Sequence, residues 1–176
     1  MSTQNESASA HGVYHVECYD SNGNLKWADT INNTVCTAGK NLALDTFLAG
    51  SAYTVTGPYI GLISSTSYSA IAAGDTQASH AGWLEAGGSN TPTYTGNRKT
   101  AAFNAASAGS KALTAALSFA MTGTGAVKGC FLIFGSGAVA TKDDRGGTLY
   151  SAGLFSGGDK TVGNGDTINV NYTASL

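Results

Sequence analysis

Residues 166–173 read DTINVNYT, and their strict alternation of apolar and polar side chains decides the fold class of this chain. Ile168, Val170 and Tyr172 fall on one face of an extended segment, and Thr and Asn side chains fall on the other. A strand with one buried and one wet face requires this period of two residues. The preceding stretch, residues 146–155 (GGTLYSAGLF), also favours a strand, and we expect a glycine-punctuated turn to join the two.

A β-hairpin is predicted near the N-terminus, with strands at 12–19 and 25–32 and the turn sequence DSNGN at 20–24. Asn-Gly supplies the positive φ angles that tight hairpin turns need. In the first strand, Tyr14, Val16 and Cys18 should face one way, and the opposite face should carry His11, Val13, His15 and Glu17.

A short helix is predicted over 37–48, with Thr37 as its N-terminal cap and Gly50 closing it. Leu44, Phe47 and Leu48 recur at i, i+3 and i+4, the spacing of an apolar face on a helix.

Three further segments indicate strands. Residues 59–63 form a short buried one, and residues 130–134 are apolar on both faces, which is typical of a central strand. Residues 111–121 are ambiguous because their alanines permit a helix, but we favour a strand whose apolar face is formed by the odd positions Leu113, Ala115, Leu117, Phe119 and Met121.

Five to eight strands with one short helix predict an all-β fold, either a β-sandwich or a jelly-roll. The chain has 176 residues, the size of one domain, which we assign to 11–176. Residues 1–10 are small and polar, without the apolar segment of a signal peptide, and are interpreted as a flexible N-terminal arm.

Charged residues make up only 11% of the chain, less than half of the roughly 25% usual in globular domains. A surface this poor in charge indicates packing against further copies of the chain or against a partner. The formal net charge of −2 and the scattered basic residues give no electrostatic reason to bind nucleic acid. No apolar run is long enough for a transmembrane helix, so no membrane partner is expected.

The three cysteines, Cys18, Cys36 and Cys130, are widely spaced and odd in number. This favours free thiols and synthesis in a reducing cytosol, although a single Cys18–Cys36 bridge stays open. Cys130 is expected to be a small buried apolar residue. Without a CxxC spacing, zinc binding is not expected.

The histidines do not indicate a catalytic or metal site. His11 and His15 share a strand face, but their Cα atoms would lie about 13 Å apart, too far for one metal ion. They are interpreted as surface side chains. His80 has no nucleophile elbow beside it and is expected to be a turn histidine, hydrogen-bonded near a packed Trp83.

The acidic and tyrosine side chains also favour structural roles. Asp143 and Asp144 lack the EF-hand pattern and are expected in a solvated loop. Four further acids could take part in a site: Asp75, Glu85, Asp159 and Asp166. Asp75 and Asp166 belong to two Gly-Asp-Thr turns and Asp159 also lies in a turn, so that of these four only Glu85 is expected outside a turn. We therefore predict no catalytic residues, cofactor or metal, and no enzyme. An alternative is a carbohydrate-binding row of exposed loop tyrosines, with Tyr53, Tyr68 and Tyr94 as the candidates.

Several short motifs resemble a family of small structural proteins of tailed bacteriophages. They are VECYD (16–20), GNLKW (23–27), YIGL (59–62), AGDT (73–76), SHAGWLE (79–85), GGTLYSAGLF (146–155), GDK (158–160) and GDT (165–167). The resemblance covers most of 13–174, but residues 87–109 match nothing in it.

The resemblance implies a virion structural protein, more specifically a capsid decoration (cement) protein that binds the outside of a phage head and stabilises the contacts between capsomers. Its partners would be the major capsid protein and further copies of itself, as a homodimer or homotrimer. It would be made in the host cytoplasm and located on the capsid surface. The alternative function is a head-fibre or tail-associated module that binds a glycan receptor of the host. The family offers no catalytic residues to carry over.

Overall fold

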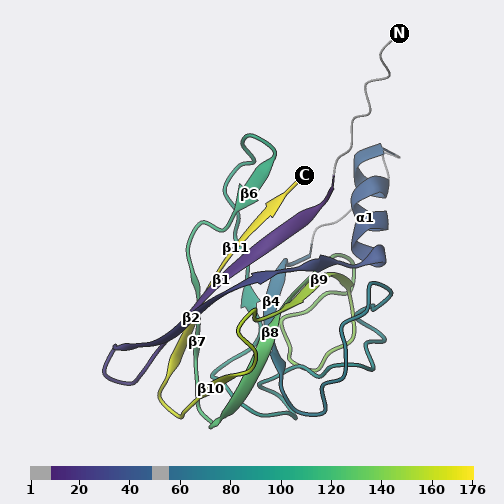
Figure 1. The fold of residues 1–176 in the computed structure, drawn as a ribbon. Coiled ribbons are helices and arrows are strands. Elements are labelled where there is room, and N and C mark those ends of the chain that lie inside the picture. Colours follow the sequence, from purple (N-terminus) through teal and green to yellow (C-terminus); the bar gives the residue numbers. More distant parts are fainter. Residues whose placement is uncertain (1–8, 49–55) are drawn as a thin grey trace.

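The computed structural model describes residues 9–48 and 56–176, and these form two antiparallel β-sheets packed face to face (Figure 1). The first sheet has the order β2-β1-β11-β6, and β7 also pairs with β11. Its strands are β1 (His11–Tyr19), β2 (Leu25–Asn32), β6 (Ser110–Ala112), β7 (Leu117–Ala120) and β11 (Thr167–Ser175).

The second sheet has the order β3-β9-β8-β4-β5, and β10 also pairs with β8. Its strands are β3 (Thr34–Val35), β4 (Tyr59–Ser64), β5 (Lys99–Thr100), β8 (Gly125–Phe134), β9 (Thr148–Leu154) and β10 (Lys160–Val162). The expected β-sandwich with one short helix is confirmed. The described residues form eleven strands rather than five to eight, because several strands have only two to four residues and leave no periodicity in the sequence.

Alternating side chains of the two sheets meet in the main core. Tyr14, Val16 and Cys18 of β1 are buried there, and Tyr14 lies against Tyr172 of β11 with ring centroids 4.4 Å apart. Ile168 and Val170 complete the buried face of β11. The second sheet contributes Ile60, Leu62, Cys130 and Leu132. The alternation predicted for β1 and β11 is therefore confirmed, with His11, His15 and Glu17 exposed on the opposite face.

The N-terminal hairpin is confirmed as β1 and β2, with its turn at residues 20–24. Gly23 has a φ of +83°. One carboxylate oxygen of Asp20 accepts hydrogen bonds from the backbone N–H groups of Asn22 and Asn24, both at 2.8 Å. The Asp20 side chain therefore closes the turn that the Asn-Gly pair makes possible.

The expectation that one turn joins 146–155 to 166–173 is wrong. The corresponding strands, β9 and β11, lie in different sheets, and β10 intervenes between them. The whole of β11 pairs with β1, so that Val170 lies opposite Val16. Alternation fixes which face of a strand is buried but not which strand pairs with it.

Residues 111–121 form two short strands, β6 and β7, rather than one long strand. Both pair with the same edge of β11, and the four residues 113–116 lie opposite only two, Asn171 and Tyr172. Such an excess on one strand is a bulge, which interrupts the pairing. The predicted apolar face is confirmed at Leu113, Phe119 and Met121, which are buried, whereas Ala115 is exposed.

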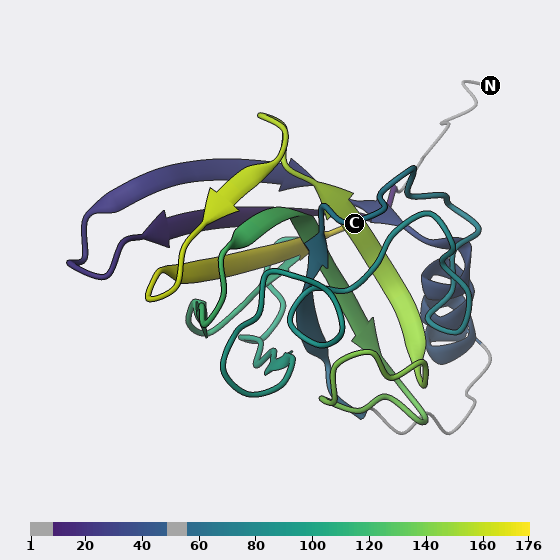
Figure 2. The same cartoon turned by 90° about the horizontal axis from the view of Figure 1, so that it is seen from below.

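The predicted central strand, β8, is confirmed and pairs with both β9 and β4. Both of its faces are buried because the second sheet is itself covered on both sides. Cys130 and Leu132 point into the main core, and Phe131 and Ile133 point into a second core on the outer face. Figure 2 shows the loops that cover this outer face, on the side away from the first sheet.

The helix α1 (Thr37–Leu48) has the predicted bounds, but a different face packs against the protein. Gly39 is buried against the backbone of Tyr150 on β9, whereas Leu44 and Leu48 are 55% and 72% exposed. Without a side chain, Gly39 lets the helix approach β9 closely, and this orients the Leu residues outward.

The start of α1 also differs from the prediction. The Cys36 carbonyl accepts the hydrogen bond from the Lys40 N–H, so Cys36 occupies the cap position and Thr37 is the first helical residue. Gly50 lies outside the described residues.

Asp29 on β2 links the two sheets. Its carboxylate forms an ion pair with Lys160 of β10 at 2.8 Å and accepts hydrogen bonds from Ser156 Oγ and the Gly157 N–H at 2.6 and 3.0 Å. Burial alone would raise the pKa of Asp29, but the hydrogen bonds from Lys160, Ser156 and Gly157 outweigh it and hold this pKa well below its ordinary value.

A methyl group at Gly39 should destabilise the protein. An added Cβ would lie 2.6 Å from the Tyr150 carbonyl oxygen, so that α1 must shift away from β9. We expect Gly39→Ala to lower the free energy of unfolding by about 1–3 kcal/mol in urea denaturation. Gly74→Ala is the matched control because a Cβ there meets nothing within 4 Å. Equal midpoints for the two variants would contradict the close contact.

The depressed pKa of Asp29 predicts a dependence of stability on pH. A carboxyl group with a lower pKa in the folded than in the unfolded state stabilises the fold above the unfolded pKa of about 3.9, and this contribution is lost as the pH falls. Asp29→Asn should therefore lower stability at neutral pH and make the acid dependence below about pH 4 shallower. Chemical denaturation across this range measures both effects. Asp45→Asn, on the exposed side of α1, serves as the control. If stability depends on pH in the same way in the unchanged protein and in Asp29→Asn, the stabilising role of Asp29 is refuted.

Candidate functional site

Two long connections, residues 65–98 and 135–147, cover the outer face of the second sheet, and we call them the loop layer. Their apolar anchor is Trp83, which is fully buried against Phe131, with ring centroids 5.2 Å apart. Ile63, Ile133, Leu149 and Ala138 belong to the same core. The loops are therefore held by a hydrophobic core of their own.

His80 stacks on Trp83 with ring centroids 3.9 Å apart, and its Nδ1 lies 3.0 Å from the Trp83 carbonyl oxygen. The interpretation as a turn histidine near a packed Trp is confirmed. Because a carbonyl only accepts, Nδ1 is the nitrogen that carries the proton. Burial lowers the pKa of His80, which favours the neutral ring.

The centre of the loop layer is a buried ion pair between Glu85 and Arg98. Arg98 Nε lies 2.9 Å from Glu85 Oε1, and Arg98 Nη2 lies 2.7 Å from Glu85 Oε2. Both residues are almost fully buried. This is the bidentate geometry in which a guanidinium binds a carboxylate most strongly.

The Glu85–Arg98 pair also binds the neighbouring loop. Arg98 donates hydrogen bonds to the carbonyl oxygens of Val139 and Asp144, at 3.1 and 2.7 Å. Glu85 Oε2 accepts a hydrogen bond from the Asp143 N–H at 2.8 Å. One ion pair therefore joins the two segments of the loop layer through contacts between residues that are 41 to 58 positions apart in the sequence.

The electrostatics of this pair combine two opposing effects. Burial raises the pKa of the Glu85 carboxyl group, while the Arg98 guanidinium and the Asp143 N–H stabilise its anion. An unpaired charge at this depth would be strongly unfavourable, so each partner requires the other.

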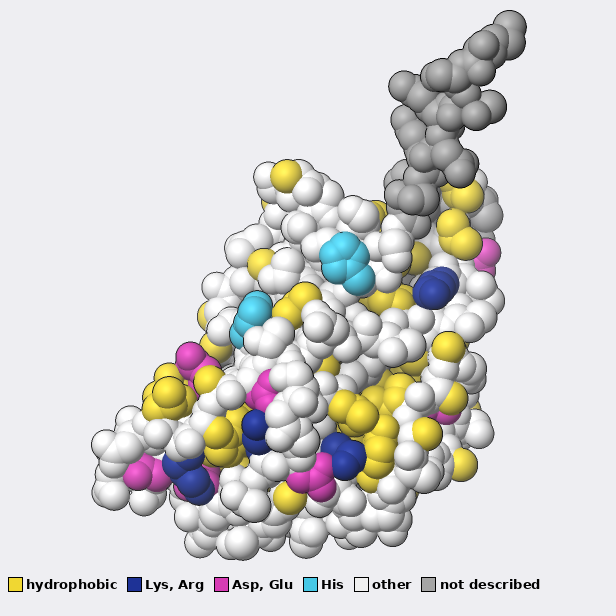
Figure 3. Space-filling view, in the orientation of Figure 1, with side chains coloured by type: hydrophobic (Ala, Val, Ile, Leu, Met, Phe, Trp, Pro, Cys, Tyr) yellow, Lys and Arg dark blue, Asp and Glu magenta, His cyan; other side chains and the backbone are white. Residues whose placement is uncertain are grey.

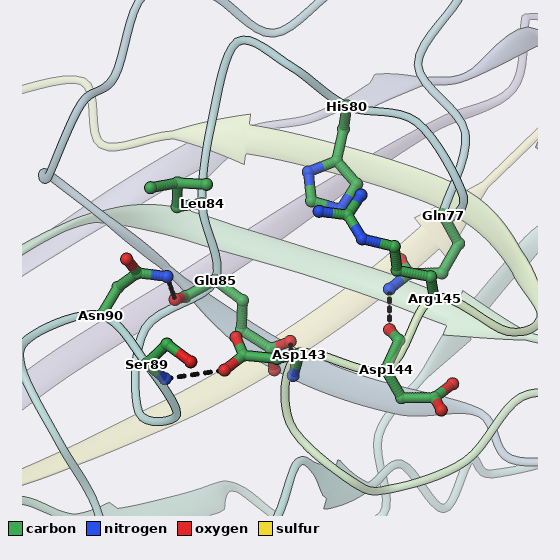
Figure 4. Close-up of a pocket in the computed structure, with 9 residues that line it drawn as sticks. All are labelled: Gln77, His80, Leu84, Glu85, Ser89, Asn90, Asp143, Asp144 and Arg145. Atoms are coloured by element: carbon green, nitrogen blue, oxygen red, sulfur yellow. Dashed lines mark hydrogen bonds between the residues drawn. The ribbon is translucent and has the colours of Figure 1, made fainter.

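A hollow of about 200 Å³ lies beside the ion pair (Figure 4). Its lining comes from both segments of the loop layer: Gln77, His80, Leu84, Glu85, Ser89, Asn90, Asp143, Asp144 and Arg145. Ser89 and Asn90 belong to the stretch Gly-Gly-Ser-Asn at residues 87–90. In the structure it is a closed turn, because Ser89 N–H donates to Asp143 Oδ2 at 2.7 Å and Asn90 Nδ2 to the Glu85 carbonyl at 3.1 Å.

The other predicted residues lie apart from this hollow. His11 and His15 are exposed on β1, as expected of surface histidines, and His15 Nδ1 lies 3.3 Å from Thr30 Oγ1. Within residues 9–48 and 56–176, no group of three His, Cys, Asp or Glu side chains is arranged to hold a metal ion. All three cysteines are free and buried, which confirms the expectation for Cys130.

The acidic residues are engaged in the structure of the protein. Asp75 and Asp166 lie in turns as predicted and accept hydrogen bonds from the backbone N–H groups of Ala72 and Gly163. Asp75 also accepts from the Trp83 indole N–H, and Asp166 and Asp159 pair with Lys26 and Lys128. Asp143 and Asp144 lie in a loop, but the contacts with Glu85 and Arg98 anchor that loop to the buried ion pair.

The two described candidates for the row of exposed loop tyrosines, Tyr68 and Tyr94, are not both exposed. Tyr94 is 2% exposed and packs edge-on against Phe119, because its ring completes the main core. Tyr68 is half-buried under the ammonium group of Lys128, 4.5 Å from its ring centroid. Tyr53 lies outside the described residues.

A second surface feature lies at the junction of α1 and the end of β11, and we call it the α1 surface. Leu44 and Leu176 line one groove, together with Ser9, Ala10, Lys40 and Ala43. An adjoining groove shares Ala43 and Leu176 and continues over Tyr150 and Ala174. Leu48 follows Leu44 by four residues and therefore lies on the same side of the helix.

Comparison of the chain with protein-family models, with curated proteins and with solved structures finds no match in any of the three. None of the helices formed by residues 9–48 and 56–176 has the length and apolar composition needed to cross a membrane. The function is therefore argued from the residues of the chain itself.

Breaking the buried ion pair should destabilise the protein far more than breaking an exposed one. Arg98→Met leaves the Glu85 carboxylate buried without a partner, and we expect a loss of about 3–5 kcal/mol in the free energy of unfolding. Lys128→Met, which breaks the more exposed pair with Asp159, should lower it by less than about 1 kcal/mol. Urea denaturation of both variants measures the difference, and comparable losses would contradict the central position of the Glu85–Arg98 pair.

Proposed function

We propose that this protein is a virion structural protein, a capsid decoration protein that binds the major capsid protein on the outside of a phage head. The observation that carries the proposal is the α1 surface. Three of the five large apolar side chains that are well exposed in the described residues belong to it: Leu44, Leu48 and Leu176. Contiguous exposed apolar groups mark surfaces that another protein covers.

The position of the N-terminal segment supports the same surface. Ser9 and Ala10 line the groove beside Leu44 and Leu176, and residues 1–8 join the described part of the chain at Ser9. A partner in the groove would therefore contact Ser9 and Ala10 as well as α1.

The composition of the surface supports a partner recognised mainly through uncharged contacts. Figure 3 shows a face on which white and yellow atoms predominate and charged groups are few. Several charges of the chain are already paired with one another, as in Lys160–Asp29, Lys26–Asp166 and Lys128–Asp159. Apolar and hydrogen-bonded contacts would then provide most of the binding free energy.

Binding to the capsid would be the sum of many weak contacts. A decoration protein contacts many equivalent positions on a symmetric shell, and modest contacts at each copy add up when the copies are linked to one another. The motifs that resemble structural proteins of tailed phages, spread over most of 13–174, are consistent with this role.

Charged substitutions on the α1 surface should abolish binding to capsids without unfolding the protein. Leu44→Glu with Leu48→Glu places two carboxylates where apolar contact is needed, and surface substitutions usually change stability by less than about 0.5 kcal/mol. Co-sedimentation with heads that lack this protein measures binding. Leu25→Glu on the N-terminal hairpin is the matched control because Leu25 is 56% exposed, like Leu44 at 55%.

We expect the control to saturate the heads like the unchanged protein, while the double variant stays in the supernatant. Full binding by the double variant would reject the α1 surface as the docking site. Loss of self-association without loss of capsid binding would assign this surface to a second copy of the chain instead.

A further inference from the structure

The hollow beside the Glu85–Arg98 pair contains a buried hydrogen-bond acceptor without a partner. Gln77 is 2% exposed, and its Nε2 donates a 2.7 Å hydrogen bond to the Asp144 carbonyl oxygen. This contact fixes the orientation of the amide, because a flipped amide would place two acceptor oxygens against each other. Oε1 of Gln77 is then left without a partner among the described residues.

Buried polar groups almost always have a hydrogen-bond partner, so a buried oxygen that lines a hollow indicates a donor-bearing occupant. Figure 4 shows the Gln77 amide turned toward the middle of the hollow. The two other unpaired buried side-chain atoms of the described residues belong to Asn33 and Tyr94, which do not line this hollow.

The charges around the hollow select against an ionic ligand. The Asp143 carboxylate lies at one side, where its Oδ2 accepts from the Ser89 N–H. Arg145 reaches across from the other side toward His80 (Figure 4). The Glu85 and Arg98 charges compensate each other. Any ion in the hollow would therefore lie near one charge of its own sign as well as near one of the opposite sign, so neither sign is favoured, and a neutral ligand that both donates and accepts hydrogen bonds fits between them.

The size and shape of the hollow narrow the class further. Its volume is about 200 Å³. A cavity of about 150 Å³ accommodates a benzene molecule, so one substituted six-membered ring is of the right size. Leu84 provides an apolar contact, and Gln77, Asn90, Asp143 and Arg145 provide polar contacts around it. All the other lining side chains are polar or charged, so the hollow suits a ligand that is held mainly by hydrogen bonds.

We propose that this hollow binds a single pyranose unit of a neutral saccharide. Its hydroxyl groups would donate to Gln77 Oε1 and to the Asp143 carboxylate and accept from the Arg145 guanidinium. The site does not depend on the decoration role, because its lining residues differ from those of the α1 surface. The hollow is also a different place from the row of loop tyrosines that the sequence offered as an alternative sugar-binding site.

Amide chemical shifts of the full chain in two-dimensional NMR test the proposal. The probes are glucose, galactose, mannose and N-acetylglucosamine at millimolar concentrations, with methylammonium chloride and sodium acetate as charged probes. At least one sugar should shift the signals of Ser89, Asn90 and Arg145. If the bound pyranose is the terminal unit of a glycan, a short oligosaccharide that ends in that sugar should shift the same signals. Absence of shifts with all four sugars, or stronger shifts with a charged probe, would overturn the proposal.

Variants identify the contacts. Asp143→Asn retains an acceptor for the Ser89 N–H and suits the φ of +62° at this position, but removes the charge. We expect it and Arg145→Met to weaken sugar binding about tenfold or more, as for the loss of a hydrogen bond to a charged group. Asp45→Asn on α1 is the control and should bind normally. Unchanged affinity for the sugar in both pocket variants would overturn the assignment of the site. Leu44→Glu, on the α1 surface, should leave sugar binding intact and weaken only the binding to capsids.

Discussion

The loop layer depends on one interaction, the buried bidentate ion pair between Glu85 and Arg98. Its carboxylate and guanidinium form hydrogen bonds with each other and with three backbone groups of residues 139–144. Removing either partner would leave an uncompensated charge on an almost fully buried side chain. The pair therefore couples the positions of the two loops. Residues of both loops line the hollow beside it, so the shape of the hollow depends on the pair.

The β-sandwich explains why such a layer is needed. The second sheet is buried on one side by the first sheet, but Phe131 and Ile133 of β8 project from its other side. Without a cover, this would be a large exposed apolar face, which is unfavourable in water. The loops supply Trp83 as the cover, and the ion pair and the hydrogen bonds of the turns hold them in place. The α1 surface remains as an uncovered apolar region, which is why we assign binding to it.

Much of the fold could be predicted because alternation reports burial directly. The periods of β1 and β11, the Asn-Gly turn and the apolar run of β8 all gave correct local structure. Strand pairing could not be predicted in the same way, since β11 pairs with β1, about 150 residues earlier in the sequence. The bulge at 113–116 and the outward orientation of Leu44 likewise depend on contacts with Tyr172 and Tyr150 that no local pattern contains.

The site was harder to predict than the fold. Among the four acids considered for a site, Asp75, Glu85, Asp159 and Asp166, only Glu85 did not fall in a predicted turn, and Arg98 belongs to the single Arg-Lys pair of the chain. Neither feature indicates that Glu85 and Arg98 meet. The turn at residues 87–90 is held by a hydrogen bond from the Ser89 N–H to the Asp143 carboxylate, a contact with a distant residue that no local pattern contains.

The most direct test of the proposed function is a cryo-electron microscopy map of virions that contain this chain. We expect density for it at regular positions on the outer surface of the head, with the α1 surface against the major capsid protein. Density confined to the tail, or none in the particle, would contradict the decoration role.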